Sequence, residues 1–334
     1  MTVLVTGGGG LVGTHVLEAL RPRGEQVRAL VRPHARAIVT ELGAEPVIGD
    51  VTDRATWERA SVGAGVRAII HAAALVAART SLDEFMRVNV GGTRLAVETA
   101  RRLGVPLVHV STVAVYGRAV APPAGRHGVA EDFPFQPLSD HDYYARSKRA
   151  AEEVVREAAL RDGLSVIAIR PNVIYGERDK LFTARVIATM RRRVLPRIGS
   201  GTNHLSCVYA GNVASAILAA LDAPPTARFC PYNVTRDKPP LLTQREFFAQ
   251  FARQLGMRVH FVPVPITMAA AGVAIWSTLQ RLLQPRRYTG LAAAVSFIVG
   301  ENPYATARIR AELGWEPPFD ARTAIARAIQ PTSS

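Results

Sequence analysis

The stretch Met1–Val16, MTVLVTGGGGLVGTHV, decides the fold. The apolar run Val3–Val5 ends at Thr6, and apolar residues resume at helical spacing from Leu11. This pattern predicts a buried strand, a glycine turn and a helix, in that order.

The glycine spacing in this stretch predicts a dinucleotide site. Gly7 permits a tight turn, Gly10 lets a pyrophosphate approach the backbone, and Gly13 lets the helix pack closely on the strand. The start of the helix would add unpaired N–H groups and the positive end of its dipole. The cofactor-binding candidates here are Thr6, Gly7, Gly10, Leu11, Val12 and Gly13.

Beyond this stretch the chain alternates strand and helix patterns, which is typical of a parallel sheet with helices on both faces. We expect an α/β fold: a Rossmann doubly wound parallel sheet with a smaller mixed α/β C-terminal substrate-binding part. Residues 1–177 would form the dinucleotide-binding domain, with 205–238 returning to it, and 178–204 and 239–334 would form the substrate-binding part.

The residue after the second expected strand, Gln26–Val31, bears on the choice of cofactor. An acidic residue there would hold the ribose 2′-hydroxyl of NAD, whereas arginine suits the 2′-phosphate of NADP. The residue is Arg32, with His34 and Arg36 nearby. NADP(H) is therefore preferred and NAD(H) is the alternative; Arg32 could instead stack on adenine or face solvent.

Later segments add further cofactor candidates. Asp50 could bind the adenine amino group or serve as a turn carboxylate, and the small residues after the fourth strand leave room for a cofactor. His71 is interpreted as a packed, hydrogen-bonded histidine, and Asn89, in an expected helix over 81–103, as a bridge to a strand end. These candidates are Asp50, Val51, Ala72, Ala73, Ala74 and Asn89.

Hydroxyl groups mark the expected catalytic centre. Ser111 and Thr112 follow the fifth strand, at the edge of a parallel sheet where ligands bind. Tyr144 and Lys148 lie four residues apart and share one face of the next expected helix. A phenol with a pKa near 10 needs a nearby cation to act at neutral pH. We predict Thr112, Tyr144 and Lys148 as catalytic, with Ser111, Tyr144 and Lys148 also contacting the cofactor.

Together these motifs resemble the extended short-chain dehydrogenase/reductases, a group that includes sugar-nucleotide epimerases and dehydratases. The segments that carry the resemblance are Thr6–Gly13, Ser111–Gly117, Tyr144–Lys148 and Arg170–Gly176. The resemblance implies that Tyr144 is the general acid/base and that Lys148 binds the nicotinamide ribose and lowers the tyrosine pKa. It also implies that Thr112 binds the reacting oxygen, that Pro171 and Val173 line the nicotinamide, and that the protein is a homodimer. Tyr143 matches no family position.

The segment 201–214 separates branches of this family. Sugar-nucleotide enzymes usually carry an arginine just before the strand at 206–209 and an aspartate near its end. The corresponding residues are His204, Leu205, Ser206 and Asn212. This pattern resembles the 3β-hydroxysteroid and sterol dehydrogenase branch, which also includes reductases of long-chain 3-keto acids. It implies a small hydrophobic substrate.

The apolar stretch 262–284 is consistent with such a substrate. It could be a core helix of the substrate-binding part, or a flap that lines an apolar pocket or touches a membrane surface, with Arg281, Arg286 and Arg287 at its end. Pro263 and Pro265 argue against a membrane span.

Composition bears on three further questions: the kind of partner, the presence of a metal site and the location of the protein. The net charge of +14 comes almost wholly from scattered arginine, so no nucleic-acid partner is expected. Cys207 and Cys230 do not have the spacing of metal ligands. We therefore expect neither a metal site nor a disulfide framework. With no secretory signal ahead of the first strand, we expect a cytoplasmic protein, with a location peripheral to a membrane as the alternative.

The sequence thus predicts an NAD(P)-dependent oxidoreductase that interconverts a secondary alcohol and a ketone on a bulky hydrophobic substrate, steroid-like or a long-chain 3-keto compound. A nucleotide-sugar 4-epimerase or dehydratase would use the same tyrosine and lysine, and is disfavoured by the missing arginine before Val208. A non-catalytic NADP(H)-binding regulatory protein could share the fold.

Overall fold

The computed structural model describes residues 1–76, 80–117, 128–225, 228–283 and 291–330. These residues form two compact units. Unit 1 comprises Met1–Asn172, Ala210–Thr235 and Pro303–Pro318, and unit 2 comprises Val173–Tyr209, Arg236–Asn302 and Phe319–Ser334.

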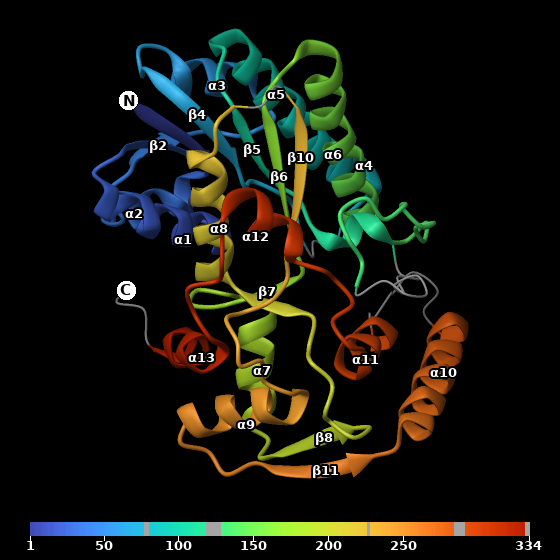
Figure 1. Ribbon diagram of the computed structural model, residues 1–334. Coiled ribbons are helices and arrows are strands. Elements are labelled where there is room, and N and C mark those ends of the chain that lie inside the picture. The colour runs from blue at the N-terminus through green and yellow to red at the C-terminus, as the bar shows by residue number, and fades with distance from the viewer. Residues whose placement is uncertain (77–79, 118–127, 226–227, 284–290, 331–334) are drawn as a thin grey trace. The chain divides into compact units, whose positions relative to one another are not determined.

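Unit 1 is built on a seven-stranded sheet in the order β10-β6-β5-β4-β1-β2-β3, with every neighbouring pair parallel (Figure 1). The predicted doubly wound sheet is confirmed. Chain order reverses between β1 and β4, the place where ligands bind at the carboxyl ends of such strands. The strands are β1 (Thr2–Thr6), β2 (Gln26–Val31), β3 (Glu45–Ile48), β4 (Val66–His71), β5 (Leu107–Val110), β6 (Val166–Pro171) and β10 (Phe229–Val234).

Helices cover both faces of this sheet (Figure 1). α1 packs against α8, whereas α5 packs against α3 and α6. The helix expected over 81–103 contains a π-helical segment, Met86–Gly91, between α4 and α5. The helices of unit 1 are α1 (Leu11–Leu20), α2 (Arg36–Glu41), α3 (Arg54–Ser61), α4 (Leu82–Phe85), α5 (Gly92–Leu103), α6 (Tyr143–Asp162), α8 (Ala210–Asp222) and α12 (Ala307–Leu313).

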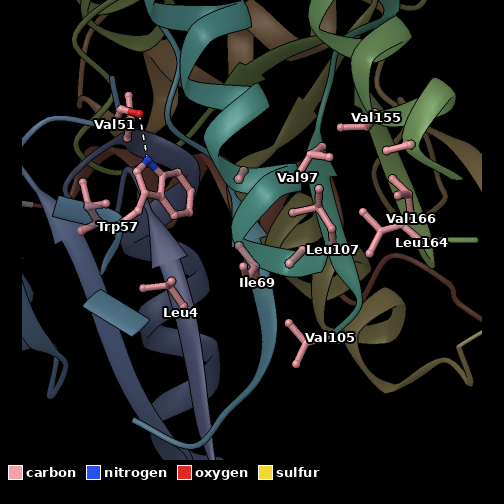
Figure 2. Packing of buried hydrophobic residues seen from close by; sticks show 14 of the residues in the cluster. Leu4, Val51, Trp57, Ile69, Val97, Val105, Leu107, Val155, Leu164 and Val166 are labelled. Atoms are coloured by element: carbon pink, nitrogen blue, oxygen red, sulfur yellow. Dashed lines mark hydrogen bonds between the residues drawn. The ribbon is translucent and has the colours of Figure 1, made fainter. Parts of the chain in front are cut away.

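The core of unit 1 lies between the sheet and the helices α3, α5 and α6. Leu4, Ile69 and Leu107, from three neighbouring strands, are all almost fully buried (Figure 2). Burying one such side chain contributes about 1.5–3 kcal/mol. Trp57 of α3 is buried beside them, and its indole Nε1 donates to the Val51 carbonyl at 2.8 Å. This bond ties the segment after β3 to the core.

Unit 2 contains two small parallel sheets, β7 with β9 and β8 with β11. Its core is aromatic: the rings of Tyr175 and Phe247 lie 5.3 Å apart, and those of Phe247 and Phe251 5.2 Å apart. The elements of unit 2 are β7 (Val173–Tyr175), α7 (Phe182–Met190), β8 (Val194–Ile198), β9 (Cys207–Tyr209), α9 (Gln244–Gln254), β11 (His260–Val264), α10 (Ile266–Leu283), α11 (Leu291–Val299) and α13 (Ala321–Ile329).

The division into units differs from the expected domains at several places, among them the bounds 173–177 and 236–238, which belong to unit 2. Residues 205–209 were expected to return to the large sheet, but β9 pairs with β7 in unit 2. Residues 303–318 belong to unit 1, because α12 packs on β10 and the Tyr304 ring stacks on Tyr116, 5.7 Å away.

Smaller differences concern single segments. The apolar stretch 262–284 divides at Pro265: Val262–Val264 lie in strand β11 and the helix begins at Ile266. Arg286 and Arg287 lie outside the described residues. Cys207 and Cys230 are both buried, and they are not joined by a disulfide bond.

Candidate active site

The glycine turn between β1 and α1 has the close contacts that its spacing predicts. Gly7 has φ +71°, and a Cβ there would lie 2.8 Å from the Ala73 backbone. A Cβ on Gly13 would lie 2.1 Å from the Gly7 carbonyl oxygen, so neither position accepts a side chain. Gly10 caps α1 with no side-chain hydrogen bond to its first N–H groups. These features fit a phosphate group at the helix N-terminus.

A pocket of about 290 Å³ adjoins this turn, within unit 1. It combines the glycine turn with the ends of β2 and β4, and is large enough for part of a dinucleotide. The predicted residues that line it are Gly7, Gly10, Arg32, Val51, Ala72, Ala73 and Ala74. The cofactor half with the phosphates and adenosine fits this shape.

Several lining residues were not predicted. They are Gly9, Leu30, Val31, His34, Ala35, Gly49, Leu75 and Val88. Two are glycines with close neighbours: a Cβ on Gly9 would lie 2.3 Å from the Ala35 methyl, and one on Gly49 would lie 2.3 Å from the Thr56 side chain. Gly9 belongs to the glycine run and could have been found there.

Arg32, which lines this pocket, contacts the carboxylate of Asp50. Arg32 Nη2 lies 3.4 Å from Asp50 Oδ2, and the Arg32 side chain is 57% exposed. Asp50 Oδ1 accepts bonds from the Thr52 backbone N–H at 2.9 Å and hydroxyl at 2.8 Å. Burial opposes the charge, but the Thr52 bonds and the Arg32 and Arg87 cations together lower the pKa of Asp50. The carboxylate is thus engaged by its own loop and by Arg32.

Two buried polar residues, Thr6 and Asn89, form hydrogen bonds with the segment that makes one wall of the pocket. The Thr6 hydroxyl accepts from the Ala73 N–H at 3.2 Å and bonds His71 Nδ1 at 2.8 Å. Asn89 Oδ1 accepts from the Leu75 N–H at 2.6 Å. Both side chains therefore fix the segment 72–75 in place.

The Thr112 hydroxyl acts on the Tyr144 phenol and lowers its pKa. Thr112 follows β5, where its Oγ1 accepts from the Ala114 N–H at 3.2 Å. Desolvation raises the pKa of Tyr144 to about 12, while the Thr112 hydroxyl lowers it and the Asp142 charge raises it. The phenol is therefore protonated at neutral pH and is suited to donate a proton.

Lys148 lies one helical turn beyond Tyr144 and is 3% exposed. Its Nζ donates to the Val110 carbonyl, at the end of β5, at 2.6 Å. Burial lowers the pKa of Lys148 to about 8, opposed by the Glu152 charge.

The remaining predicted residues lie in different surroundings. Leu11 and Val12 form the first turn of α1. The Ser111 hydroxyl donates to the buried Glu152 carboxylate. Pro171 ends β6 in unit 1, whereas Val173 begins β7 in unit 2.

Just before β9, where sugar-nucleotide enzymes usually carry an arginine, this chain has a histidine that contacts a carboxylate. The His204 backbone N–H and Nδ1 each lie 2.9 Å from the Glu301 carboxylate. The neighbouring Asn203 amide donates to the carbonyls of Ile298 and Gly300 at 2.9 and 2.8 Å. The loop before β9 is therefore tied to the segment after α11.

Comparison with known proteins identifies the family. Residues 3–234 match the model of the NAD dependent epimerase/dehydratase family. A "4-hydroxy-2-methyl-3-oxo-4-farnesyl-3,4-dihydroquinoline-1-oxide ketoreductase" of Stigmatella aurantiaca is 32% identical, over 94% of this chain and 92% of the relative. A "2-alkyl-3-oxoalkanoate reductase" of Stenotrophomonas maltophilia is 32% identical, over 77% and 76%. The mouse (Mus musculus) "3 beta-hydroxysteroid dehydrogenase type 7" is 29% identical, over 99% and 95%.

Solved structures share the fold. The crystal structure of gox2253 has a TM-score of 0.75 at 26% identity, covering 98% of this chain and 96% of that one. The UDP-glucose 4-epimerase of Thermus thermophilus, in complex with NAD, has a TM-score of 0.71 at 25% identity, covering 99% and 100%. The relatives named above are a ketoreductase, a reductase and a dehydrogenase, and the family model is that of NAD dependent enzymes. The chain belongs to the NAD dependent epimerase/dehydratase family of extended short-chain dehydrogenase/reductases, in its 3β-hydroxysteroid dehydrogenase-like branch.

Proposed function

We propose that this enzyme interconverts a secondary alcohol and a ketone on a bulky hydrophobic substrate, steroid-like or a long-chain 3-keto compound. The observation that carries the proposal is the grouping of the protonated Tyr144, on whose pKa the Thr112 hydroxyl acts, with the buried Lys148 one helical turn away. An acid poised beside a hydroxyl donor suits a carbonyl oxygen that gains charge during reduction.

A nicotinamide cofactor held at the glycine turn and the pocket beside it would supply the hydride that reduces the carbonyl carbon. Tyr144 keeps its proton at Oη until the carbonyl oxygen takes it, and Thr112 orients that oxygen by a hydrogen bond. The resulting tyrosinate regains a proton from solvent. The Lys148 ammonium, held by the Val110 carbonyl, stabilises the negative charge that Tyr144 carries in between.

NADP(H) is the proposed cofactor, with NAD(H) as the alternative. Arg32 and His34 both line the cofactor pocket. Arg32 is exposed enough to accept a second anion beside Asp50, and a guanidinium binds a phosphate well.

The loop before β9 supports a hydrophobic substrate over a nucleotide sugar. The Glu301 carboxylate lies 2.9 Å from the His204 ring, so a negative charge stands near the position where sugar-nucleotide enzymes bind a diphosphate. A second anion would be repelled there. The relatives named as ketoreductase and oxoalkanoate reductase point the same way.

Contact with a membrane surface is a further part of the proposal, with the cytoplasm as the general location. Ile266, Met268 and Ile275 of α10 are all more than half exposed, as in a helix that lies on an apolar surface. None of the helices in the described part of the chain has the length and apolar character that crossing a bilayer requires. A homodimer is proposed from the family resemblance, and light scattering would test it.

The proposal is tested by following NADPH absorbance while the purified protein meets a panel of hydrophobic 3-ketones, with nucleotide sugars in parallel. Stoichiometric loss of NADPH with a ketone is the expected result. Isomerisation of a nucleotide sugar without net cofactor consumption would replace the proposal with the epimerase alternative. Tight NADPH binding with neither reaction would favour a regulatory role.

A further inference from the structure

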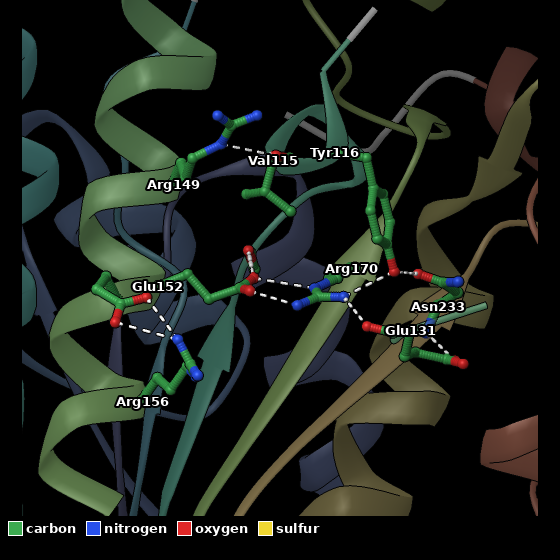
Figure 3. Close-up of polar contacts among 10 residues, drawn as sticks. Val115, Tyr116, Glu131, Arg149, Glu152, Arg156, Arg170 and Asn233 are labelled. Atoms are coloured by element: carbon green, nitrogen blue, oxygen red, sulfur yellow. Dashed lines mark hydrogen bonds and ion pairs between the residues drawn. The ribbon is translucent and has the colours of Figure 1, made fainter. Parts of the chain in front are cut away.

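A buried carboxylate lies one helical turn beyond Lys148. Glu152 of α6 is 2% exposed, and Arg170 of β6 is its ion-pair partner (Figure 3). Arg170 Nε donates to Glu152 Oε2 at 3.1 Å, and the Ser111 hydroxyl donates to the same oxygen. The helix, the end of β5 and strand β6 thus meet at one carboxylate.

Arg170 is held on its other side as well. Its Nη1 donates to Tyr116 Oη at 2.7 Å and to the Glu131 carbonyl at 3.0 Å. Tyr116 Oη in turn donates to Asn233 Oδ1 of β10 at 2.9 Å (Figure 3). Taking an ion pair out of water is costly, and a buried pair often adds no net stability over apolar packing. The mechanism proposed above uses neither the Glu152 charge nor the Arg170 charge directly. It therefore does not explain why this ion pair is buried beside the active site.

The surroundings of Lys148 indicate that role. Burial and the Lys148 charge lower the pKa of His71 to about 3, and the same effects lower the pKa of His109 well below its usual value. Both histidines are therefore neutral, and Glu152 supplies the negative charge that acts on Lys148. Titratable groups on the elements around Lys148 include Tyr144 and Glu152 on its own helix, His71 on β4, His109 on β5 and Arg170 on β6.

We propose that Glu152 is a positioning residue of the active site: clamped by Arg170 and Ser111, it keeps the Lys148 ammonium charged and docked on the Val110 carbonyl. The catalytic meaning of this inference rests on the proposed function. The charge state of Lys148, however, is measurable without any substrate.

The chain contains three lysines, Lys148, Lys180 and Lys238, so NMR of protein labelled with ¹³C-lysine resolves each titration. Lys148→Met assigns the signal. Glu152→Gln should lower the pKa of Lys148. Because that variant leaves Arg170 without its buried partner and can fail to fold, the double variant Glu152→Gln/Arg170→Gln removes both charges. It should also lower the pKa of Lys148, since Glu152 is the charge that raises it.

The matched control is Glu153→Gln/Arg156→Gln, an exposed ion pair on the same helix with 3.2 Å between Arg156 Nη1 and Glu153 Oε1. It should leave the Lys148 titration unchanged. An unchanged Lys148 titration in the Glu152→Gln/Arg170→Gln variant would overturn the inference and leave the pair a purely structural role.

A second readout uses turnover. If ketone reduction requires the Lys148 ammonium, the alkaline limb of the pH profile of kcat/KM should move to lower pH in the Glu152 variants and not in the control. A uniform loss of activity with an unmoved limb would contradict the inference. If no ketone is reduced at all, the proposed function fails, whereas the NMR titration still decides the role of Glu152.

Discussion

The rings of His71 and His109 stack inside the large sheet, with their centroids 5.7 Å apart and their planes 25° from parallel. The two residues are register partners on the neighbouring strands β4 and β5. Within the described part of the chain, His71 Nε2 and both ring nitrogens of His109 have no hydrogen-bond partner. Protonating either ring would place an uncompensated charge in the core, near the Lys148 ammonium.

This stacked pair predicts that the fold loses stability in mild acid. The unfolded chain takes up protons at its histidines below a pKa near 6.5, whereas burial holds the pKa of folded His71 at about 3. The free energy of unfolding should therefore fall as pH drops through this window, by about 1.4 kcal/mol per pH unit for each histidine.

Urea unfolding between neutral pH and about pH 5 measures this slope. His109→Leu removes one of the two groups and should reduce the loss per pH unit by about 1.4 kcal/mol. His141→Leu, at an exposed position, is the control and should keep the wild-type slope. An identical slope in His109→Leu and the wild type would show that the pair is not responsible.

Arg32 predicts the choice of cofactor. Arg32→Ala should weaken NADPH binding by about tenfold or more, because a charged hydrogen bond contributes about 1.5–3 kcal/mol, and should leave NADH nearly unchanged. Fluorescence titration with both cofactors gives the two dissociation constants. Arg36→Ala, at an exposed position on the next helix, serves as the control. A preference ratio that stays the same in Arg32→Ala would exclude the 2′-phosphate role.

Gly13 predicts a packing requirement for the cofactor site. A Cβ at Gly13 would lie 2.1 Å from the Gly7 carbonyl oxygen, so Gly13→Ala should displace α1 from the glycine turn. We expect a loss of about 1–3 kcal/mol in stability together with weaker nucleotide binding. Gly91→Ala is the matched control, because a Cβ there meets nothing within 4 Å. Equal thermal shifts and equal nucleotide affinities in the two variants would contradict this explanation.

The exposed face of α10 predicts binding to lipid vesicles. Met268 and Ile275 are 66% and 63% exposed, so Met268→Gln/Ile275→Gln should reduce co-sedimentation with anionic phosphatidylglycerol vesicles. Leu160→Gln, at a 68% exposed leucine of α6, is the control. If neither variant changes the bound fraction, α10 does not meet the membrane.

The parts of the site that were predicted from the sequence depend on short-range geometry. The turn at Gly7 and Gly13 is decided within a few residues, and the spacing of Tyr144 and Lys148 places them on one helical face. The Asp50 carboxylate is engaged by Thr52, two residues away, and that aspartate–threonine spacing is a local signal for a turn.

Contacts between distant residues could not be predicted in this way. Arg170 and Glu152 are 18 positions apart on different elements, and His204 and Glu301 are 97 apart. Neither pairing leaves a periodic trace in the sequence, because each depends on how the strands and helices are arranged in space. The same reason explains why Tyr304 and α12, expected in the substrate-binding part, lie in unit 1.

Two adjacent tyrosines give the sharpest test of the catalytic assignment. The Thr112 hydroxyl acts on the pKa of Tyr144, whereas the Tyr143 ring packs edge-on against Phe85, with centroids 6.4 Å apart. Tyr144→Phe removes the proton donor and should lower kcat by about 10²–10⁴-fold while cofactor affinity is kept. Tyr143→Phe keeps the ring contact and should retain most activity. Steady-state kinetics on a ketone that the wild type reduces, with NADPH titrations alongside, separate the two effects; equal losses in both variants would show that Tyr144 is not the acid.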